Sequence, residues 1–215
     1  GFLGVDADEI VFTSGGSEAN NLAIKGLAWA NPERRRLVRS ALEHYSVAYS
    51  CDFLGRWGWT TDVVGVDGDG RLDLAAFAAA LGPDVLLAAV QHANNEIGTV
   101  QDVALVAKLA QAHGALTLVD AAQSAGKLPV TPRAWGVDLV AIAGHKFGGP
   151  QGVGALYKRR GVTLEPLVHG AGHEDGLRSG THPVAQLVGL GAACELAGRD
   201  LDAAAARMRG LPQGL

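Results

Sequence analysis

The most constraining feature of this sequence is a regular alternation of short apolar segments with longer segments of helical periodicity. Such alternation is typical of a largely parallel β-sheet that helices cover on both faces. The expected strands are residues 9–13, 37–41, 60–66, 85–90, 116–119, 139–143 and 154–157. The expected helices are residues 17–29, 46–57, 73–81, 103–112 and 183–208. We therefore predict an α/β fold with a mostly parallel seven-stranded sheet. Because no repeat or linker interrupts the pattern, we expect one domain over residues 1–215.

The composition supports a folded protein and narrows its possible partners. Hydrophobic residues make up 48% of the 215 residues and charged residues 19%, which is enough for a substantial core. The 18 Lys and Arg residues are scattered apart from a short run at 34–36, so no nucleic-acid-binding surface is expected. Two cysteines cannot build a disulfide framework, and neither a signal peptide nor a bilayer-spanning apolar run is evident. These features predict a cytoplasmic protein that binds neither nucleic acid nor membrane.

Lys146 is the first candidate for a catalytic residue. It follows the apolar segment 137–142, and no other Asp, Glu, Lys or Arg lies between Asp138 and Lys158. An amine at the end of a buried strand is expected to be desolvated, which favours the neutral, nucleophilic form that Schiff-base chemistry needs. A loop lysine without a catalytic role would occupy the same kind of position. Asp120, however, is a second lone charge at the end of an apolar strand, and together the two residues supply the charges that a pyridoxal phosphate (PLP) site requires.

Other polar segments also follow predicted strands, where the ligands of open α/β sheets bind. Gly16 and Ser17 lie at the start of a predicted helix, whose free N–H groups suit a phosphate, although a plain helix cap is equally consistent. His44 follows the second strand, where it can cover an aromatic cofactor, act as an acid or base, or simply bond to the backbone. The predicted convergence of these segments indicates a single ligand-binding crevice.

Three more segments carry candidate ligand-binding groups. Asn95 belongs to a polar loop at 92–98 that either binds a ligand through its amides or forms an Asx turn. Gln123, three residues after the lone aspartate, can donate to the oxygen of a PLP ring, while that aspartate can instead cap a helix. His169 and His173 are four residues apart, but the glycines between them argue against the helix that would make them a metal pair, so no metal site is expected.

Several motifs together resemble the cysteine desulfurases, which belong to the class V aminotransferase group of fold-type-I PLP enzymes. The resemblance is collinear and covers nearly the whole chain. Its most specific pieces are the NNEIG and Gly-His-Lys motifs. The motifs are SGGSEANNLAIKG, the Glu-His pair at 43–44, NNEIGTVQD, VDAAQSAGKLP, AGHKFGGPQGVGALY and RSGTHPV.

The resemblance implies PLP as cofactor and assigns a set of residues to it, with Lys146 and His44 as the catalytic ones. It also implies a homodimer, because one assigned residue reaches the cofactor of a neighbouring subunit. The assigned residues are Gly16, Ser17 and His145 at the phosphate, Asn95 beside cofactor and substrate, Asp120 at the pyridine nitrogen, Gln123 at the ring oxygen, His44 stacked on the ring, Lys146 as the Schiff-base lysine, and Thr181 at the neighbouring subunit's phosphate.

The sequence departs from the family at several positions. Ala143 stands where a serine is frequent, which weakens cofactor binding by about one hydrogen bond, or 0.5–1.5 kcal/mol. Asp175 stands where a basic residue is common, and Ser17 replaces the usual threonine while keeping a hydroxyl. Cys51 and Cys194 lie in helical patterns and are expected to be buried structural thiols. The family's reactive loop cysteine and its arginine for the substrate carboxylate lie beyond the matched segment, so we expect a PLP-binding large domain without the N-terminal segment and the C-terminal small domain.

The function that the resemblance implies is conversion of L-cysteine to L-alanine, with the sulfur passed to an enzyme cysteine outside this chain as a persulfide. That sulfur would serve iron–sulfur cluster assembly or thiolation through a sulfur-acceptor or scaffold protein. A selenocysteine lyase or another enzyme of the class V aminotransferase type is the alternative activity. A non-catalytic fragment with a binding role is the third possibility.

Overall fold

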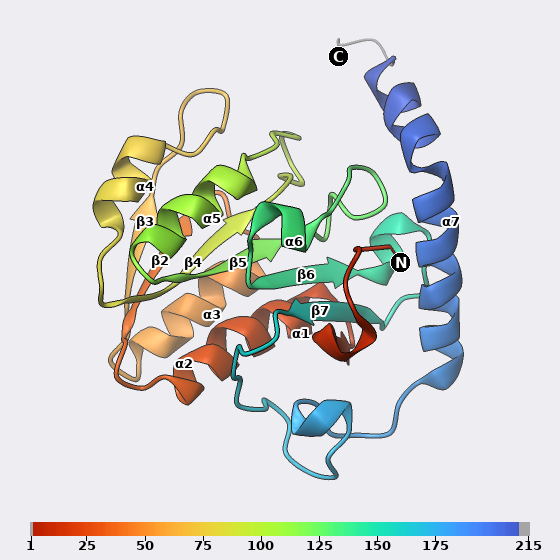
Figure 1. Cartoon of the computed structure of the whole chain (residues 1–215), viewed down its shortest axis with the longest axis horizontal. Helices are drawn as coiled ribbons and strands as arrows, with labels where there is room; N and C mark the ends of the chain where they lie inside the picture. The colour runs from red at the N-terminus through yellow and green to blue at the C-terminus, as the bar shows by residue number, and fades with distance from the viewer. Residues whose placement is uncertain (1, 211–215) are drawn as a thin grey trace.

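The computed structural model describes residues 2–210, which contain a seven-stranded β-sheet (Figure 1). The strands lie in the order β1-β7-β6-β5-β4-β2-β3. Neighbouring strands pair in parallel except that β7 pairs antiparallel with both β1 and β6. The predicted mostly parallel seven-stranded α/β fold is therefore confirmed. The strands are β1 Ile10–Thr13, β2 Arg36–Ser40, β3 Thr60–Val64, β4 Val85–Gln91, β5 Leu116–Asp120, β6 Leu139–Ala143 and β7 Gly154–Lys158.

Helices cover both faces of the sheet, as predicted (Figure 1). The elements α1, η2 and α2 form one continuous helical run with a π-helical middle, and this run packs with α3 on one face. The helices α4, α5 and α6 lie on the other face, while α7 contacts η3. No helix within residues 2–210 combines the length and apolarity needed to cross a bilayer. The α- and π-helices are α1 Gly16–Asn21, η2 Leu22–Gly26, α2 Leu27–Ala30, α3 Tyr45–Gly55, α4 Leu74–Ala80, α5 Val103–Ala112, α6 Pro132–Trp135 and α7 Val184–Arg209, and the 3-10 turns are η1 Ala7–Glu9, η3 Gly144–Phe147 and η4 Glu174–Gly176.

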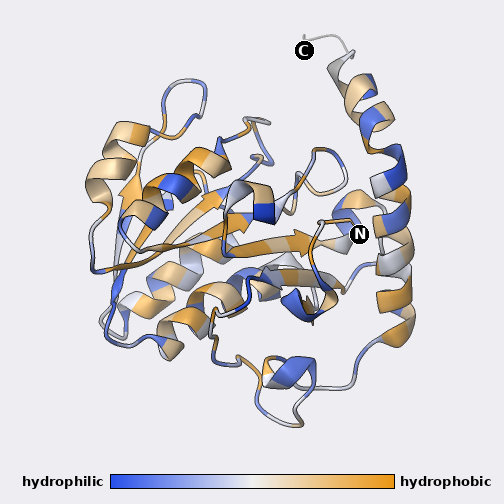
Figure 2. Ribbon diagram, in the orientation of Figure 1, coloured by the Kyte–Doolittle hydropathy of each residue, from blue (hydrophilic) through white to orange (hydrophobic). Residues whose placement is uncertain are grey.

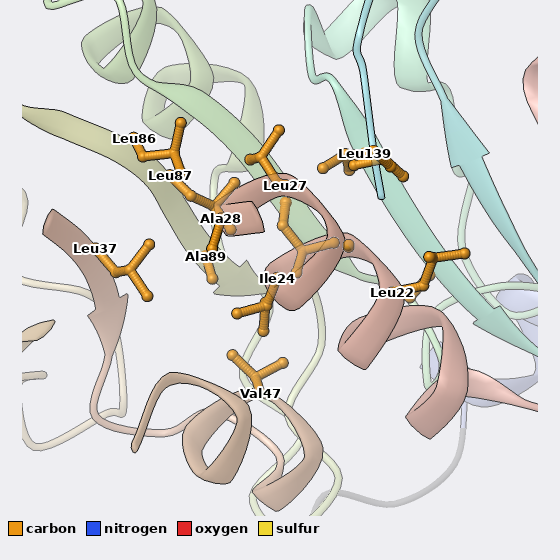
Figure 3. Packing of buried hydrophobic residues seen from close by; sticks show 14 of the residues in the cluster. Leu22, Ile24, Leu27, Ala28, Leu37, Val47, Leu86, Leu87, Ala89 and Leu139 are labelled. Atoms are coloured by element: carbon orange, nitrogen blue, oxygen red, sulfur yellow. The ribbon is translucent and has the colours of Figure 1, made fainter. Parts of the chain in front are cut away.

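The alternation of side chains along the central strands divides the core between the two faces. Leu118 and Leu139 pack with α1–α3, whereas Val119 and Val140, one residue further along, pack in a cluster that includes residues of α5. Every residue of β4 and β6 is buried, as expected for parallel strands with helices on both sides. Figure 2 shows the central strands as the most hydrophobic part of the ribbon, and Figure 3 shows the first cluster at close range. The rigid sheet thus fixes where the strand-end residues lie.

The element boundaries differ from the predicted ones in a few places. The first strand begins one residue late because Glu9 belongs to η1, where its buried carboxylate accepts a hydrogen bond from Arg133. The third strand ends at Val64 rather than 66, and Val66 forms only an isolated bridge with Leu72 beside the predicted turn. The short elements η1, α6, η3 and η4 were not predicted, because three or four residues are too few to display helical periodicity.

Candidate active site

A cavity of about 240 Å³ lies at the carboxyl ends of β4, β5 and β6. The parallel arrangement of these strands brings their last residues, and the loops that follow, to the same edge of the sheet. All of the predicted site residues except Thr181 line this cavity. The lining residues are Gly16, Ser17, Asn20, His44, Ser46, Gln91, Asn95, Asp120, Ala122, Gln123, Ala143, His145 and Lys146.

Asp120 is the buried charge of the cavity, with 2% of its surface exposed. Its Oδ1 accepts from the backbone N–H of Ala122 at 2.9 Å, and its Oδ2 accepts from Asn20 Nδ2 at 2.8 Å. Burial raises the pKa of this carboxyl, while the two hydrogen bonds and the positive charge of Lys146 partly oppose that rise. A carboxylate that accepts on both oxygens in a closed environment is a fixed negative group, suited to pair with a cationic ligand atom.

Lys146 lies on the cavity wall in η3, directly after β6. The expectation that it is desolvated is wrong for this chain, because Lys146 is exposed. The physical reason is the chain path: β6 ends at Ala143, and the turn then carries Lys146 to the open edge of the sheet. Its positive charge nevertheless lies close enough to Asp120 to lower the pKa of that carboxyl.

Asn20 is a site residue that the sequence analysis did not identify. It is 1% exposed, and its side-chain amide donates to both Asp120 Oδ2 and Ser46 Oγ, the latter at 2.9 Å. Its Oδ1 is buried and has no hydrogen-bond partner in the described part of the chain. A sequence signal for it existed, because Asn20 follows Gly16 by one helical turn on the apolar, inward face of the predicted helix.

In the loop after β4, two neighbouring asparagines that the sequence could not distinguish make different contacts. Asn94 forms the Asx turn, because its Oδ1 accepts from the backbone N–H groups of Glu96 and Ile97. Asn95 lines the cavity, and its Oδ1 accepts from Gln91 Nε2 at 3.3 Å. The Asx turn is therefore confirmed for Asn94, whereas ligand binding by Asn95 stays a prediction.

Gln123 lines the cavity with its amide orientation set by a neighbour. Lys127 Nζ donates to Gln123 Oε1 at 3.0 Å, and burial lowers the pKa of this lysine, with a smaller contribution from the charge of Lys146. A lysine can only donate, so the amide oxygen must face Lys127 and the amide nitrogen must face away. No described residue accepts a hydrogen bond from Gln123 Nε2, which leaves that N–H pair free for a ligand.

Gly16 and Ser17 begin the α1–α2 run, where the first backbone N–H groups of a helix lack partners within the helix. Gly154, at the start of β7, allows this loop to lie directly against the sheet, because a Cβ there would come within 2.7 Å of Gly15 Cα. His145 lies on the same cavity wall and is exposed. Together these groups form a positive, donor-rich corner that suits a phosphate.

The segment that carries Thr181 lies apart from the cavity. Thr181 is exposed, and the segment before it is tied to the fold by a 3.1 Å ion pair between Arg178 and Glu18 and by Glu174, which accepts from the backbone N–H of Phe12 at 2.7 Å. The predicted role of Thr181 at a neighbouring subunit's phosphate stays a prediction.

In residues 2–210 no group of three or more His, Cys, Asp or Glu side chains is arranged to hold a metal ion.

Neither cysteine of the chain resembles a nucleophile. Cys51 is buried, and burial raises the pKa of its thiol to about 12. Cys194 is half-buried, less than predicted, and burial raises the pKa of its thiol to about 11. Because the thiolate is the reactive form, the raised pKa disfavours reaction of both thiols near neutral pH.

The family model "Aminotransferase class-V" matches residues 1–211, and this chain belongs to that family. Among curated relatives, the cysteine desulfurase IscS of Salmonella arizonae is 44% identical over 212 residues, which cover 97% of this chain and 52% of that protein. A cysteine desulfurase of Cereibacter sphaeroides is 48% identical over 197 residues, covering 91% of this chain and 51% of that protein. The predicted resemblance to cysteine desulfurases is confirmed.

Solved structures agree with the sequence relatives. A structure titled "NIFS-LIKE PROTEIN" superposes with a TM-score of 0.93 at 38% identity and covers 96% of this chain and 57% of that one. A structure titled "SspA in complex with cysteine" has a TM-score of 0.87 at 41% identity and covers 90% and 57%. The chain thus spans about half the length of the curated relatives it matches.

Proposed function

We propose that this chain is the PLP-binding domain of a cysteine desulfurase, which converts L-cysteine to L-alanine and passes the sulfur to a cysteine outside this chain. One observation carries the proposal: the buried carboxylate of Asp120 and the amine of Lys146 line the same small cavity. Names of relatives support the substrate, since the matched proteins are cysteine desulfurases and one matched structure is titled as a complex with cysteine.

The residues present fit PLP in their chemistry. Asp120 offers a buried carboxylate for a protonated pyridine nitrogen, and the free N–H groups at the start of α1, with Ser17 and His145, offer donors for the phosphate. The free Nε2 of Gln123 suits the ring oxygen. Asn20, which donates to the Asp120 carboxylate, also has a buried Oδ1 without a hydrogen-bond partner among the described residues.

When bound, PLP supplies an aldehyde for the substrate amine and a protonated ring that withdraws electrons from the substrate Cα. Lys146 would hold the cofactor through its Nζ and would carry the proton removed from and returned to the substrate Cα. The Asp120 carboxylate would keep the ring nitrogen protonated, which burial alone would disfavour. His44 would cover one face of the ring, and Asn95 would orient the substrate.

The remaining parts of the proposal reach beyond this chain. We propose a homodimer, in which Thr181 reaches the partner's phosphate. The stacked rings of Tyr45 and Tyr49, which are 69% and 64% exposed beside the cavity, support it, because exposed tyrosines are enriched at interfaces. The sulfur-accepting cysteine, a sulfur-acceptor or scaffold protein for iron–sulfur cluster assembly, and a cytoplasmic location complete the proposal.

The test begins with PLP added to the purified chain. We expect a visible absorption band that borohydride reduction converts to a stable adduct, with peptide mapping placing the adduct on Lys146. A folded protein that stays colourless would favour a non-catalytic role. The longer coding frame, assayed for alanine and sulfide from cysteine and for alanine and selenide from selenocysteine, then separates a desulfurase from a selenocysteine lyase.

A further inference from the structure

A chain of hydrogen bonds links the buried carboxylate to the histidine across three segments of the fold. Asn20 Nδ2 donates to Asp120 Oδ2 at 2.8 Å and to Ser46 Oγ at 2.9 Å. Ser46 Oγ in turn lies 2.7 Å from His44 Nδ1. Both hydrogens of the Asn20 amide are therefore committed, one toward each end of the chain.

The direction of these hydrogen bonds follows from groups that cannot reverse. Asp120 accepts on both oxygens, so the nitrogen of the Asn20 amide, and not its oxygen, must face it. Ser46 Oγ accepts from Asn20, which leaves the hydroxyl hydrogen of Ser46 available for His44 Nδ1. The hydrogen bonds thus diverge from the Asn20 amide, which donates to the carboxylate on one side and, through the Ser46 hydroxyl, orders the imidazole on the other.

A backbone hydrogen bond determines which ring nitrogen of His44 carries the proton. His44 is the N-cap of α3, and the backbone N–H of Ser46 in the first turn donates to His44 Nδ1 at 3.1 Å. A backbone N–H can only donate, so a ring nitrogen that accepts from it carries no proton. Among residues 2–210 no carboxylate lies within hydrogen-bond distance of His44 to hold a proton on Nδ1 instead.

We infer that Asn20 and Ser46 are positioning residues that hold neutral His44 in the tautomer with its proton on Nε2. The Nε2 atom bonds to no described residue, and His44 lines the cavity. His44 therefore presents a proton donor to the cavity, and a bound substrate meets an N–H rather than a basic lone pair. This consequence rests on the proposed function, whereas the tautomer itself does not.

The test is two-bond proton–nitrogen NMR on the chain with ¹⁵N-labelled histidine, at a pH where His44 is neutral and without PLP. The His44 signals are assigned by their loss in His44→Gln. We expect Nδ1 at the shift of an unprotonated and Nε2 at that of a protonated ring nitrogen. Equal populations of the two tautomers, or a proton mainly on Nδ1, would overturn the inference.

Variants separate the hydroxyl from the backbone contribution. Ser46→Ala keeps the backbone N–H and removes the hydroxyl, so the share of the Nδ1–H form should rise roughly two- to tenfold, as expected for one lost hydrogen bond. Ser46→Thr should restore the wild-type ratio. Asn20→Ala should loosen the hydroxyl and give a smaller rise in the same direction. An unchanged tautomer ratio in both Ser46→Ala and Asn20→Ala would show that these residues do not position His44.

PLP binding, measured separately on the same samples, reports on the proposed function. A chain that fails to bind PLP but shows the Nε2–H tautomer would refute the first proposal and leave the second standing. A chain that binds PLP but lacks the Nε2–H tautomer would refute the second proposal and leave the first standing.

Discussion

The ends of β5 and β6 each carry one lone charge, yet the structure treats the two charges differently. Asp120 is the last residue of β5, is 2% exposed and has hydrogen bonds to both oxygens. Lys146 comes three residues after β6 ends, in a turn, and is exposed. The difference shows that one group of this pair is held rigidly before any ligand binds, whereas the other is free to reach for one.

The largest expected effect comes from removing the exposed member of the pair. Lys146→Ala should abolish the borohydride-stable PLP adduct while changing the free energy of unfolding by less than about 0.5 kcal/mol, because an exposed side chain contributes little to stability. Mass spectrometry after reduction and urea unfolding measure the two. Lys108→Ala, at an exposed lysine away from the cavity lining, is the matched control and should keep the adduct. An adduct that persists in Lys146→Ala would locate the Schiff base elsewhere.

Removing the buried member, Asp120, should lower the stability of the chain as well as its affinity for PLP. Asp120→Ala leaves the N–H groups of Ala122 and Asn20 without their acceptor, so the free energy of unfolding should fall by about 1–3 kcal/mol. PLP affinity should fall roughly ten- to hundredfold through loss of a charge-assisted hydrogen bond. Urea titration and equilibrium dialysis measure these changes. If Lys146→Ala destabilised the chain more than Asp120→Ala, the contrast between the two strand ends would fail.

The pH dependence of stability offers a third test, through Glu43 beside the same cavity. Burial raises the pKa of Glu43 well above its usual value, with a smaller contribution from Asp120, and Glu43 Oε2 is buried without a partner in the described residues. A carboxyl with a raised folded-state pKa binds more protons when folded, so its contribution to stability falls as pH rises above about 4.5.

We therefore expect the free energy of unfolding of the wild type to decline from pH 4.5 toward neutral pH relative to Glu43→Gln. The variant keeps an acceptor for the Gln91 backbone N–H, so it isolates the charge. Urea unfolding across this range measures the difference. A difference between the two proteins that stayed constant with pH would mean that Glu43 does not titrate there.

The smallest expected effect concerns the orientation of Gln123. Lys127→Met removes the donor that turns the amide oxygen away from the cavity, so PLP affinity should fall only about two- to tenfold, as for one neutral hydrogen bond. Lys127→Arg, which keeps a donor, serves as the control. Equal PLP affinity in the Met variant and the wild type would show that the amide orients without help.

Most of the fold followed from the sequence because its signals are local. Apolar runs such as Leu139–Ala143 and the turn at 67–70 identify strands and their ends without reference to distant residues. Much of the candidate site followed too, because strand ends of a parallel sheet must meet at one edge. Asn20 escaped notice because its role depends on Ser46 and Asp120, which lie 26 and 100 residues away along the chain.

The sequence by itself determined the α/β fold class, the edge at which polar residues gather and the family resemblance, because periodicity and motif spacing are properties of the chain alone. The tertiary structure decided which of these polar groups are buried from solvent. Burial depends on what packs over a residue: the first helix covers Asp120 and supplies Asn20 to it, while no element of residues 2–210 buries Lys146. Desolvation, and with it the pKa of each group, is therefore set by contacts between segments that are remote in sequence.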